Sequence, residues 1–140
     1  FGPRALGNRS LLADPRKIST KSHVNAIKRR QKFRPFAPAI LEEYCTDYFE
    51  MPAHSRYMSY VYQCKRPHDI PAVLHVDNSA RVQTVPESSE SILREILEVW
   101  YERTGCPVLL NTSLNIRGKP MVNDFCDALN FSAKYRIDVY

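Results

Sequence analysis

Cationic and small polar side chains recur at three well-separated places in this sequence of 140 residues. A phosphorylated ligand such as ATP requires fixed cations, because charge-assisted hydrogen bonds to its oxygens contribute about 1.5–3 kcal/mol each. Hydroxyl and amide side chains add donors and acceptors that can orient a planar amide or a carboxylate-like substrate. The residues concerned are Lys32 and Arg34 in KRRQKFRPFAP (28–38), Arg81 in HVDNSARVQTV (75–85), and Ser113 and Asn115 in LLNTSLNIRGKP (109–120).

Each of these residues also has a purely structural interpretation. Ser113 and Asn115 could form an ordinary turn through local bonds from side chain to backbone. Arg81 could make an ion pair on a strand surface, and Lys32 and Arg34 could simply be solvated. Residue types alone leave a turn and a binding site equally open at 113–115.

The net charge of +5 is concentrated in one segment, since residues 28–34 alone hold five Lys and Arg residues. Such a run is usually a solvated helical face, and an anionic ligand or a nucleic-acid backbone is the functional alternative. Pro35 and Pro38 follow at once and turn the chain into an extended apolar segment, which argues against a nucleic-acid footprint. We therefore favour a small phosphorylated ligand.

Length and composition indicate one globular domain spanning residues 1–140, with 44% hydrophobic and 25% charged residues. No apolar run approaches the roughly 20 residues that cross a bilayer, so we expect no membrane association. The chain opens on Phe1-Gly2-Pro3-Arg4, without an initiator Met or a signal-like segment. We interpret it as a cytoplasmic part of a longer protein.

The cysteine and histidine residues show none of the pair spacings typical of metal sites. We expect the cysteines to be reduced and buried, and we expect no metal ligand set among these residues. The residues are Cys45, Cys64, Cys106 and Cys126, and His23, His54, His68 and His75.

Hydrophobic periodicity predicts alternating helices and strands, and therefore an α/β fold with helices packed on a sheet. The clearest helix is 89–104, with apolar residues at three-and-four spacing before Gly105, and the clearest strand is 56–64, with alternating Tyr and Met side chains. In the helix at 124–134 we expect Phe125, Ala128, Leu129 and Phe131 to face inward. The remaining predicted helices are 18–31 and 42–50, and the remaining strands are 36–41, 107–111 and 137–140.

The apolar run at 107–111 has the composition of a strand that is covered on both faces. Its end releases Thr112, Ser113 and Asn115 into a loop. Ligands of open α/β sheets bind beyond the carboxyl ends of strands, so this position favours a functional role for the polar residues.

Four long blocks of the sequence closely resemble the carboxy-terminal region of the O-carbamoyltransferases of antibiotic biosynthesis and nodulation-factor modification. The resemblance covers nearly all 140 residues. It implies a single-domain, twisted mixed sheet of the YrdC-like kind, with a K-x-R element matched by Lys32-Phe33-Arg34 and an S-x-N element matched by Ser113-Leu114-Asn115. The blocks are FGPRALGNRSLLADPR (1–16), NAIKRRQKFRPFAPAIL (25–41), HVDNSARVQTV (75–85) and TGCPVLLNTSLNIRGKPMV (104–122).

This resemblance implies that the domain uses carbamoyl phosphate and ATP, with Mg²⁺, to form carbamoyl-AMP with loss of pyrophosphate. A separate amino-terminal domain, similar to Kae-type metalloproteins and holding the family metal site, then passes the carbamoyl group to a hydroxyl-bearing small molecule. Lys32, Arg34 and Arg81 are assigned to the phosphates, and Ser113 and Asn115 to the nucleotide phosphates or the carbamoyl group. Arg4 and Arg9, in the expected junction 1–16, could reach the same pocket or line a passage between the two sites.

Two other classes of function stay open. One is a non-catalytic RNA-binding module that uses the basic segment 28–34, and the other is a degenerate domain that only supports its partner domain. The family usually has Gly-Thr where this chain has Asn78-Ser79. Because Asn also tolerates a left-handed backbone, we expect the turn before Arg81 to form without glycine.

Overall fold

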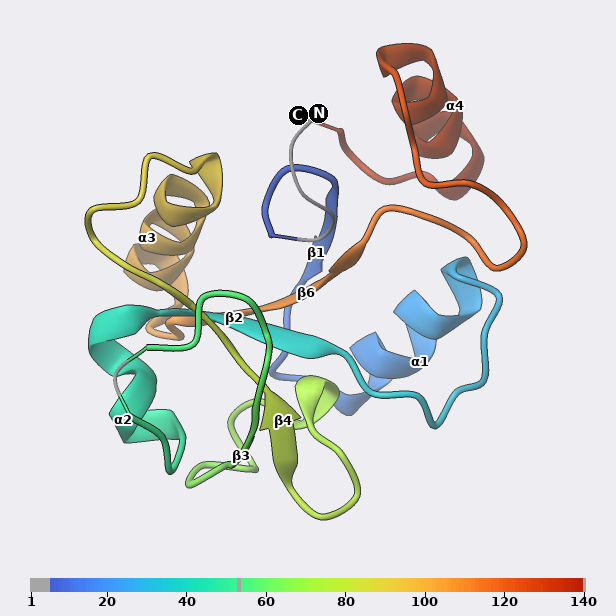
Figure 1. Cartoon of the computed structure of the whole chain (residues 1–140). Helices are drawn as coiled ribbons and strands as arrows, with labels where there is room; N and C mark the ends of the chain where they lie inside the picture. Colours follow the sequence, from blue (N-terminus) through green and yellow to red (C-terminus); the bar gives the residue numbers. More distant parts are fainter. Residues whose placement is uncertain (1–5, 53, 140) are drawn as a thin grey trace.

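A mixed four-stranded sheet forms the centre of the molecule (Figure 1). The computed structural model describes residues 6–52 and 54–139. Strand order is β1-β6-β2-β5, in which β6 is antiparallel to both of its neighbours and β2 is parallel to β5. These strands are β1 (Ser10–Ala13), β2 (Ala37–Leu41), β5 (Gln83–Val85) and β6 (Val108–Ser113). A separate antiparallel pair joins β3 (Val61–Gln63) and β4 (Ser79–Arg81).

Alternating side chains of β2 pack into two different hydrophobic clusters, because successive residues of a strand face opposite ways. Ile40 packs in one cluster with Val24 of α1, and Ala39 and Leu41 pack in the other with Leu97 of α3. The α/β class with a mixed sheet and packed helices, expected from the sequence, is thus confirmed. The helices are α1 (Ile18–Ile27), α2 (Cys45–Tyr48), α3 (Ile92–Thr104) and α4 (Phe125–Tyr135), with short 3₁₀ segments η1 (Glu42–Tyr44) and η2 (Pro71–Val73).

Helix α1 ends four residues earlier than the predicted 18–31. Lys28 caps it, and Arg29 then adopts a left-handed conformation with φ 52°. The Arg30 N–H donates to the Asn25 carbonyl at 3.1 Å, which completes the reversal of the chain. Residues 30–36 therefore leave the helix axis and lead into β2 as an irregular segment.

Several other predicted elements are shorter than expected or absent. The helix predicted at 42–50 is a 3₁₀ turn followed by the single-turn α2, and the strand predicted at 56–64 contains only Val61–Gln63. Residues 137–139 form no strand, and Tyr140 lies outside the described residues. The short strands β1, β4 and β5 were missed altogether.

The burial predictions hold in part. Ala128 and Phe131 of α4 are buried, but Phe125 and Leu129 are exposed. Cys45, Cys64 and Cys106 are buried as expected, whereas Cys126 is exposed. Asn78 has φ 61°, so the turn before Arg81 does use a left-handed Asn in place of glycine. Among the described residues, no helix is long and apolar enough to span a membrane.

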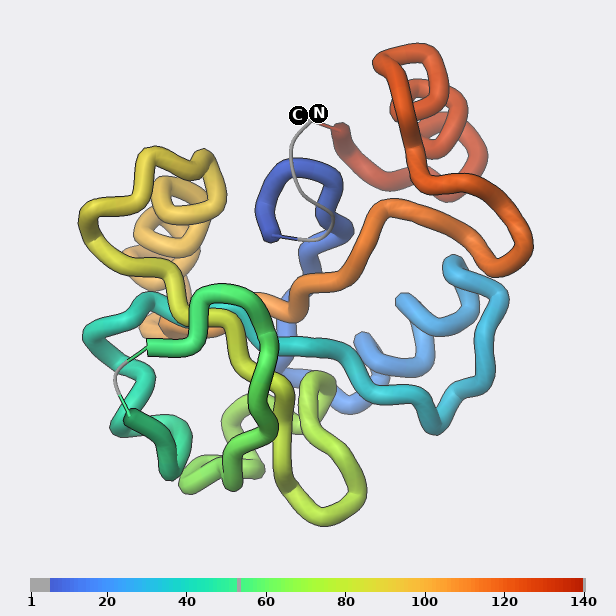
Figure 2. The backbone as a smooth tube through the Cα atoms, viewed as in Figure 1, coloured from blue at the N-terminus to red at the C-terminus, as the bar shows by residue number. Residues whose placement is uncertain are grey.

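The segment between β6 and α4 passes close to the end of α1, as Figure 2 shows. The Arg117 N–H donates to the Lys28 carbonyl at 3.1 Å. Gly118, with φ 75°, supplies a left-handed residue in the turn that follows. Two stretches almost 90 positions apart in the sequence thus lie side by side.

Candidate functional site

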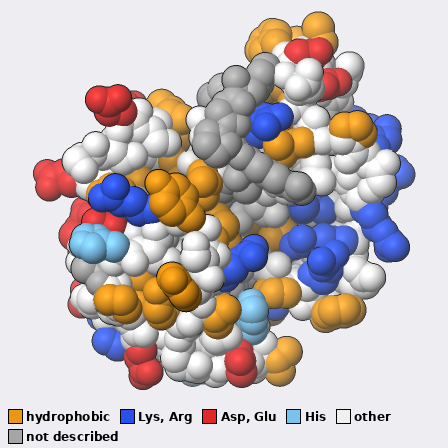
Figure 3. All heavy atoms as spheres, in the orientation of Figure 1, with side chains coloured by type: hydrophobic (Ala, Val, Ile, Leu, Met, Phe, Trp, Pro, Cys, Tyr) orange, Lys and Arg blue, Asp and Glu red, His pale blue; other side chains and the backbone are white. Residues whose placement is uncertain are grey.

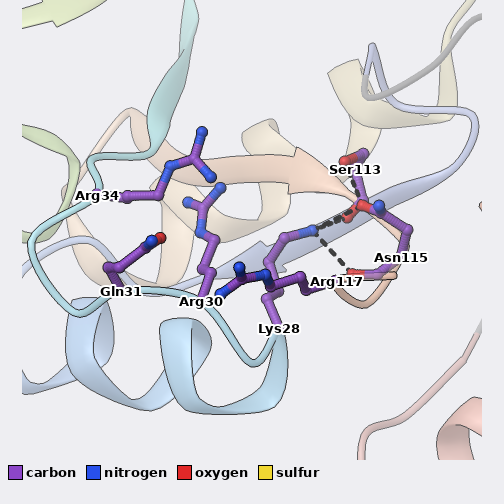
Figure 4. A pocket seen from close by; sticks show the side chains of 7 residues that line it. All are labelled: Lys28, Arg30, Gln31, Arg34, Ser113, Asn115 and Arg117. Carbon is purple, nitrogen blue, oxygen red and sulfur yellow. Dashed lines mark hydrogen bonds between the residues drawn. The ribbon is translucent and has the colours of Figure 1, made fainter. Parts of the chain in front are cut away.

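A cavity of about 290 Å³ opens where the end of α1 meets the end of β6; we call it the basic pocket. The segment after α1 contributes one wall, and the last residue of β6 with the loop after it contributes the other. Figure 4 shows the lining side chains pointing toward one hollow. They are Lys28, Arg30, Gln31, Arg34, Ser113, Asn115 and Arg117.

Three of the residues singled out from the sequence lie together in this pocket: Arg34, Ser113 and Asn115. β6 ends at Ser113, two positions later than the predicted strand end at 111, so Ser113 is the last residue of the strand and not part of the loop, where Asn115 lies. Polar side chains at the carboxyl end of this strand therefore line a cavity, and their roles toward a ligand stay predictions.

The other predicted site residues lie elsewhere. Lys32 is exposed and does not line the pocket, and exposed Arg81 lies in β4 opposite Val61 of β3. Half-buried Arg9 donates from Nη1 to the Val122 carbonyl at 3.3 Å and accepts the Leu114 N–H at its own carbonyl at 2.9 Å, so it braces the loop after β6. Arg4 lies outside the described residues. The roles assigned to these residues stay predictions.

Two lining residues that the sequence analysis missed, Lys28 and Arg30, form a K-x-R element of their own. The K-x-R pattern occurs twice in KRRQKFR, at 28–30 and at 32–34. From the first match both cations line the pocket, and from the second only Arg34 does. The repeated K-x-R pattern could have pointed to Lys28 and Arg30 from the sequence alone. Because α1 ends at Ile27, both cations of the first match lie at the pocket.

Lys28 is a positioning group. The residue is only 4% exposed. Its Nζ donates to the backbone carbonyls of Ser113 and Asn115, and also to the side-chain oxygen Oδ1 of Asn115 at 3.0 Å. Asn115 Oδ1 also accepts the Ser113 hydroxyl proton at 2.6 Å. The side-chain oxygen Oδ1 of Asn115 is thus held by Lys28 and Ser113, so the side-chain NH₂ group of Asn115 can donate to a ligand. The lone pairs of Ser113 Oγ can accept a hydrogen bond from a ligand.

Arg30 is held by its own neighbours. Its Nε donates to Asn25 Oδ1 at 2.6 Å, its Nη2 donates to the Pro35 carbonyl at 3.1 Å, and its guanidinium lies 4.2 Å from the centre of the Phe36 ring. Burial, and then the nearby charge of Arg34, lower the pKa of Arg30 to about 10. The group stays protonated at neutral pH, and an anion between the two guanidinium groups would relieve their repulsion.

The fully buried amide of Asn25 organises the segment that carries these cations. Its Nδ2 donates to the carbonyls of Lys32 and Arg34 at 3.1 and 3.0 Å, while its Oδ1 accepts from Arg30. All of these bonds reach residues that follow α1, so the side chain fixes the path of the basic segment 28–34.

Cations dominate the described lining of the basic pocket. Of the seven described residues that line it, four are Lys or Arg and none is Asp or Glu. Within the described parts of the chain, Arg34 and Arg117 make no side-chain hydrogen bond or ion pair, whereas Arg94 and Arg16 pair with Glu43 and Asp14 elsewhere. Figure 3 shows Lys and Arg side chains gathered on this part of the surface. Two arginines in one hollow without an acidic partner among the described residues, Arg34 and Arg117, favour an anionic ligand.

Among the described residues, the lining of the basic pocket holds no carboxylate for the expected Mg²⁺ ion. Such an ion is usually held by one or two carboxylates as well as by the phosphates of its nucleotide. No carboxylate lines the cavity, and no group of three or more His, Cys, Asp or Glu side chains that could hold a metal occurs among the described residues.

Comparison with known proteins assigns the family. The family described as carbamoyltransferase C-terminus matches residues 1–140. The chain is 44% identical over 135 residues to nodulation protein NolNO of Sinorhizobium fredii, covering 92% of this chain and 20% of that protein. It is 41% identical over 141 residues to nodulation protein U of Rhizobium tropici, covering 99% and 24%.

An uncharacterized protein of Methanocaldococcus jannaschii is 40% identical over 140 residues, covering 99% of this chain and 27% of its own length. The chain thus spans about a fifth to a quarter of these relatives. Because the family match extends over the whole chain, its membership does not depend on one short motif. The chain belongs to the carbamoyltransferase C-terminus family.

Proposed function

We propose that this chain is the carbamoyl-activating part of an ATP-dependent O-carbamoyltransferase. It binds carbamoyl phosphate and ATP in the basic pocket and forms carbamoyl-AMP. An amino-terminal domain of the longer protein, which would hold the family metal site, then transfers the carbamoyl group to a hydroxyl acceptor. Family membership supports this proposal, and so do the pocket arginines Arg34 and Arg117, which make no ion pair with any described residue.

The formation of carbamoyl-AMP balances in two steps. Water cleaves carbamoyl phosphate to carbamate and inorganic phosphate. A carbamate oxygen then attacks the α-phosphorus of ATP, the bond to the β-phosphate breaks, and pyrophosphate leaves. No side-chain nucleophile is needed, so the demands on the protein are in-line positioning and neutralisation of phosphate charge.

The residues of the pocket divide these tasks. Arg34 and Arg117, whose guanidinium groups are not committed to other described residues, bind the phosphate oxygens together with the remaining donors of Arg30. The amide of Asn115 donates to an oxygen of the ligand, and Lys28 holds that amide in place. A carbamoyl group carries an NH₂ donor and a carbonyl acceptor, which suit Ser113 Oγ and the Asn115 amide respectively.

The observation that carries the proposal is the meeting of Arg34, Ser113 and Asn115 with three further cations around one cavity. The test is carbamoyl phosphate-dependent exchange of labelled pyrophosphate into ATP. Arg34→Ala should lower this exchange about 10- to 100-fold, the loss expected for a charge-assisted hydrogen bond. Arg103→Ala, an exposed arginine of α3 outside the pocket, is the matched control and should change nothing. Equal exchange by both variants would refute the proposal.

The sequence-based roles of Lys32 and Arg81 can be tested in the same assay. Both side chains are exposed and neither lines the basic pocket. From their positions we expect Lys32→Ala and Arg81→Ala to retain most of the exchange that Arg34→Ala loses. A loss as large as that of Arg34→Ala would show that the phosphates extend to these residues.

RNA binding is the second candidate, because exposed Arg29, Lys32 and Phe33 extend the basic surface beyond the pocket. RNA bound there would show a steep salt dependence and no competition from ATP. Competition by ATP would instead assign the basic surface to the nucleotide.

A further inference from the structure

A second cavity, of about 310 Å³, adjoins the basic pocket and lies between the loop after β6 and helix α4. Asn115 lines both cavities, so its side chain stands at the boundary between them. We call this cavity the apolar pocket, because it has apolar and aromatic side chains that the basic pocket lacks, among them Ile116, Met121, Phe131 and Tyr135. Polar side chains line it as well: Lys119, Asp127, Asn130 and Lys134. The two cavities therefore form adjoining compartments, of which the first is lined by cationic and polar side chains and the second by apolar and aromatic side chains together with polar ones.

Aromatic rings form one side of the apolar pocket. The rings of Phe131 and Tyr135 pack with centroids 4.8 Å apart at an interplanar angle of 47°, and Lys134 Nζ lies 5.8 Å from the centre of the Tyr135 ring. Asn130, one turn of α4 before Lys134, adds an amide to the lining. Apolar faces beside a few polar groups are the surroundings that a planar nitrogen heterocycle requires, since its faces stack and its edge forms hydrogen bonds.

The loop that separates the two pockets is anchored at both of its ends. The Val122 N–H donates to the Leu114 carbonyl at 3.2 Å, which closes the loop on itself. Arg9 Nη1 donates to the Val122 carbonyl at 3.3 Å and ties the same residue to the segment before β1. These bonds hold Asn115 and Ile116 between the cavities without any ligand.

From this arrangement we infer that the apolar pocket binds the aromatic base of the nucleotide whose phosphates lie in the basic pocket. The inference rests on the proposed nucleotide-binding function and adds to it the location of the base. A nucleotide combines a polyanionic tail with a flat heterocycle, and the two compartments that meet at Asn115 match these two parts.

The test compares ATP with inorganic tripolyphosphate, which has the same phosphate chain and no base. Isothermal titration calorimetry on the 140-residue chain, at one fixed Mg²⁺ concentration, should show ATP binding about tenfold more tightly than tripolyphosphate. Tyr135→Leu removes a ring from the apolar pocket and keeps an apolar side chain. It should bring ATP down to the affinity of tripolyphosphate and leave tripolyphosphate unchanged.

The matched control is Phe125→Leu, which makes the same kind of change on the same helix at a residue that is 67% exposed and does not line the pocket. It should leave both affinities unchanged. If Tyr135→Leu weakened both ligands equally, or weakened ATP no more than Phe125→Leu does, the base would not lie in this pocket.

A second comparison needs no substitution and so does not depend on the folding of a variant. If the unmodified chain bound ATP no more tightly than tripolyphosphate, the base pocket would be refuted while the phosphate site stood. Failure of the proposed function has a different signature, because the unmodified chain would then bind neither ATP nor carbamoyl phosphate.

Discussion

Replacement of Asn25 by alanine should cost both stability and ligand affinity, although Asn25 does not line the basic pocket. Its amide makes three hydrogen bonds to the segment after α1, two to backbone carbonyls and one from Arg30. Neutral bonds contribute about 0.5–1.5 kcal/mol each, and a bond to a charged group about 1.5–3 kcal/mol. Lys32 and Arg34 are exposed, so water can replace the lost donors at their carbonyls. We therefore take the lower part of these ranges.

The expected loss for Asn25→Ala is about 3 kcal/mol of unfolding free energy, measured by urea denaturation. The affinity for carbamoyl phosphate should fall about tenfold in calorimetry, because Arg30 and Arg34 lose their common anchor. Ser22→Ala, at an exposed position of the same helix, is the control and should stay within about 0.5 kcal/mol of the unmodified chain.

Two results would contradict this reasoning. A stability loss for Asn25→Ala no larger than that of Ser22→Ala would mean that the buried amide bonds are replaced without cost. A large stability loss with unchanged carbamoyl phosphate affinity would mean that Asn25 supports the fold but does not position the basic segment.

Three further predictions concern charge and backbone geometry. Arg29→Gly should raise the unfolding free energy by about 1 kcal/mol in urea denaturation, since glycine adopts the observed φ of 52° without strain. Carbamoyl phosphate at a hundredfold excess over its Kd should raise the unfolding free energy of the unmodified chain by about 2.7 kcal/mol. If Arg34→Ala lowers the affinity a hundredfold, the same concentration should raise the unfolding free energy of that variant by only about 0.4 kcal/mol. The hydrogen-bonded Arg94 guanidinium lowers the pKa of Glu43 below its ordinary value of 4.5, so this carboxylate stabilises the fold above that pH and the contribution disappears as the pH falls through the lowered pKa. Between pH 5 and pH 3, the unfolding free energy of the unmodified chain should therefore fall more steeply than that of Arg94→Met.

The parts of the fold that were predictable carry a strong local pattern. Helix α3 has apolar residues at helical spacing, a Ser91 cap and a left-handed Gly105 at its end, and the structure contains all three features. Strand β2 and the first three residues of β6 are apolar and buried, and each of these strands pairs with a neighbour on both of its edges. In these elements the local and the tertiary preferences agree.

The elements that were missed or overextended are set by contacts distant in sequence. β4 and β5 have three residues each, too few to show a period, and they exist because they pair with Val61–Gln63 and with β2. The alternating segment 56–64 was predicted as a long strand, but Met58 has φ 53°, which interrupts an extended backbone. The helix predicted to 50 stops at Tyr48, because Phe49 forms a bridge with Cys64.

The same limit explains which half of the site was predictable. Ser113 and Asn115 come soon after the apolar run at 108–110, which marks β6 in the sequence even though the strand itself continues to Ser113. Lys28 and Arg30 were overlooked because nothing local marks the end of α1: the left-handed position after its cap is Arg29, where helices usually have glycine.

The early end of α1 also explains how the K-x-R element works. In a helix continued to residue 31, side chains two positions apart would differ in direction by about 200°, so Lys28 and Arg30 would face opposite sides. The left-handed turn at Arg29 cancels this divergence, and both side chains reach the basic pocket. Lys28 then fixes Asn115, and Arg30 shares Asn25 with the backbone of Arg34. The cations of the pocket thus depend on one backbone reversal and one buried amide, which is why Asn25→Ala should affect ligand binding from outside the cavity.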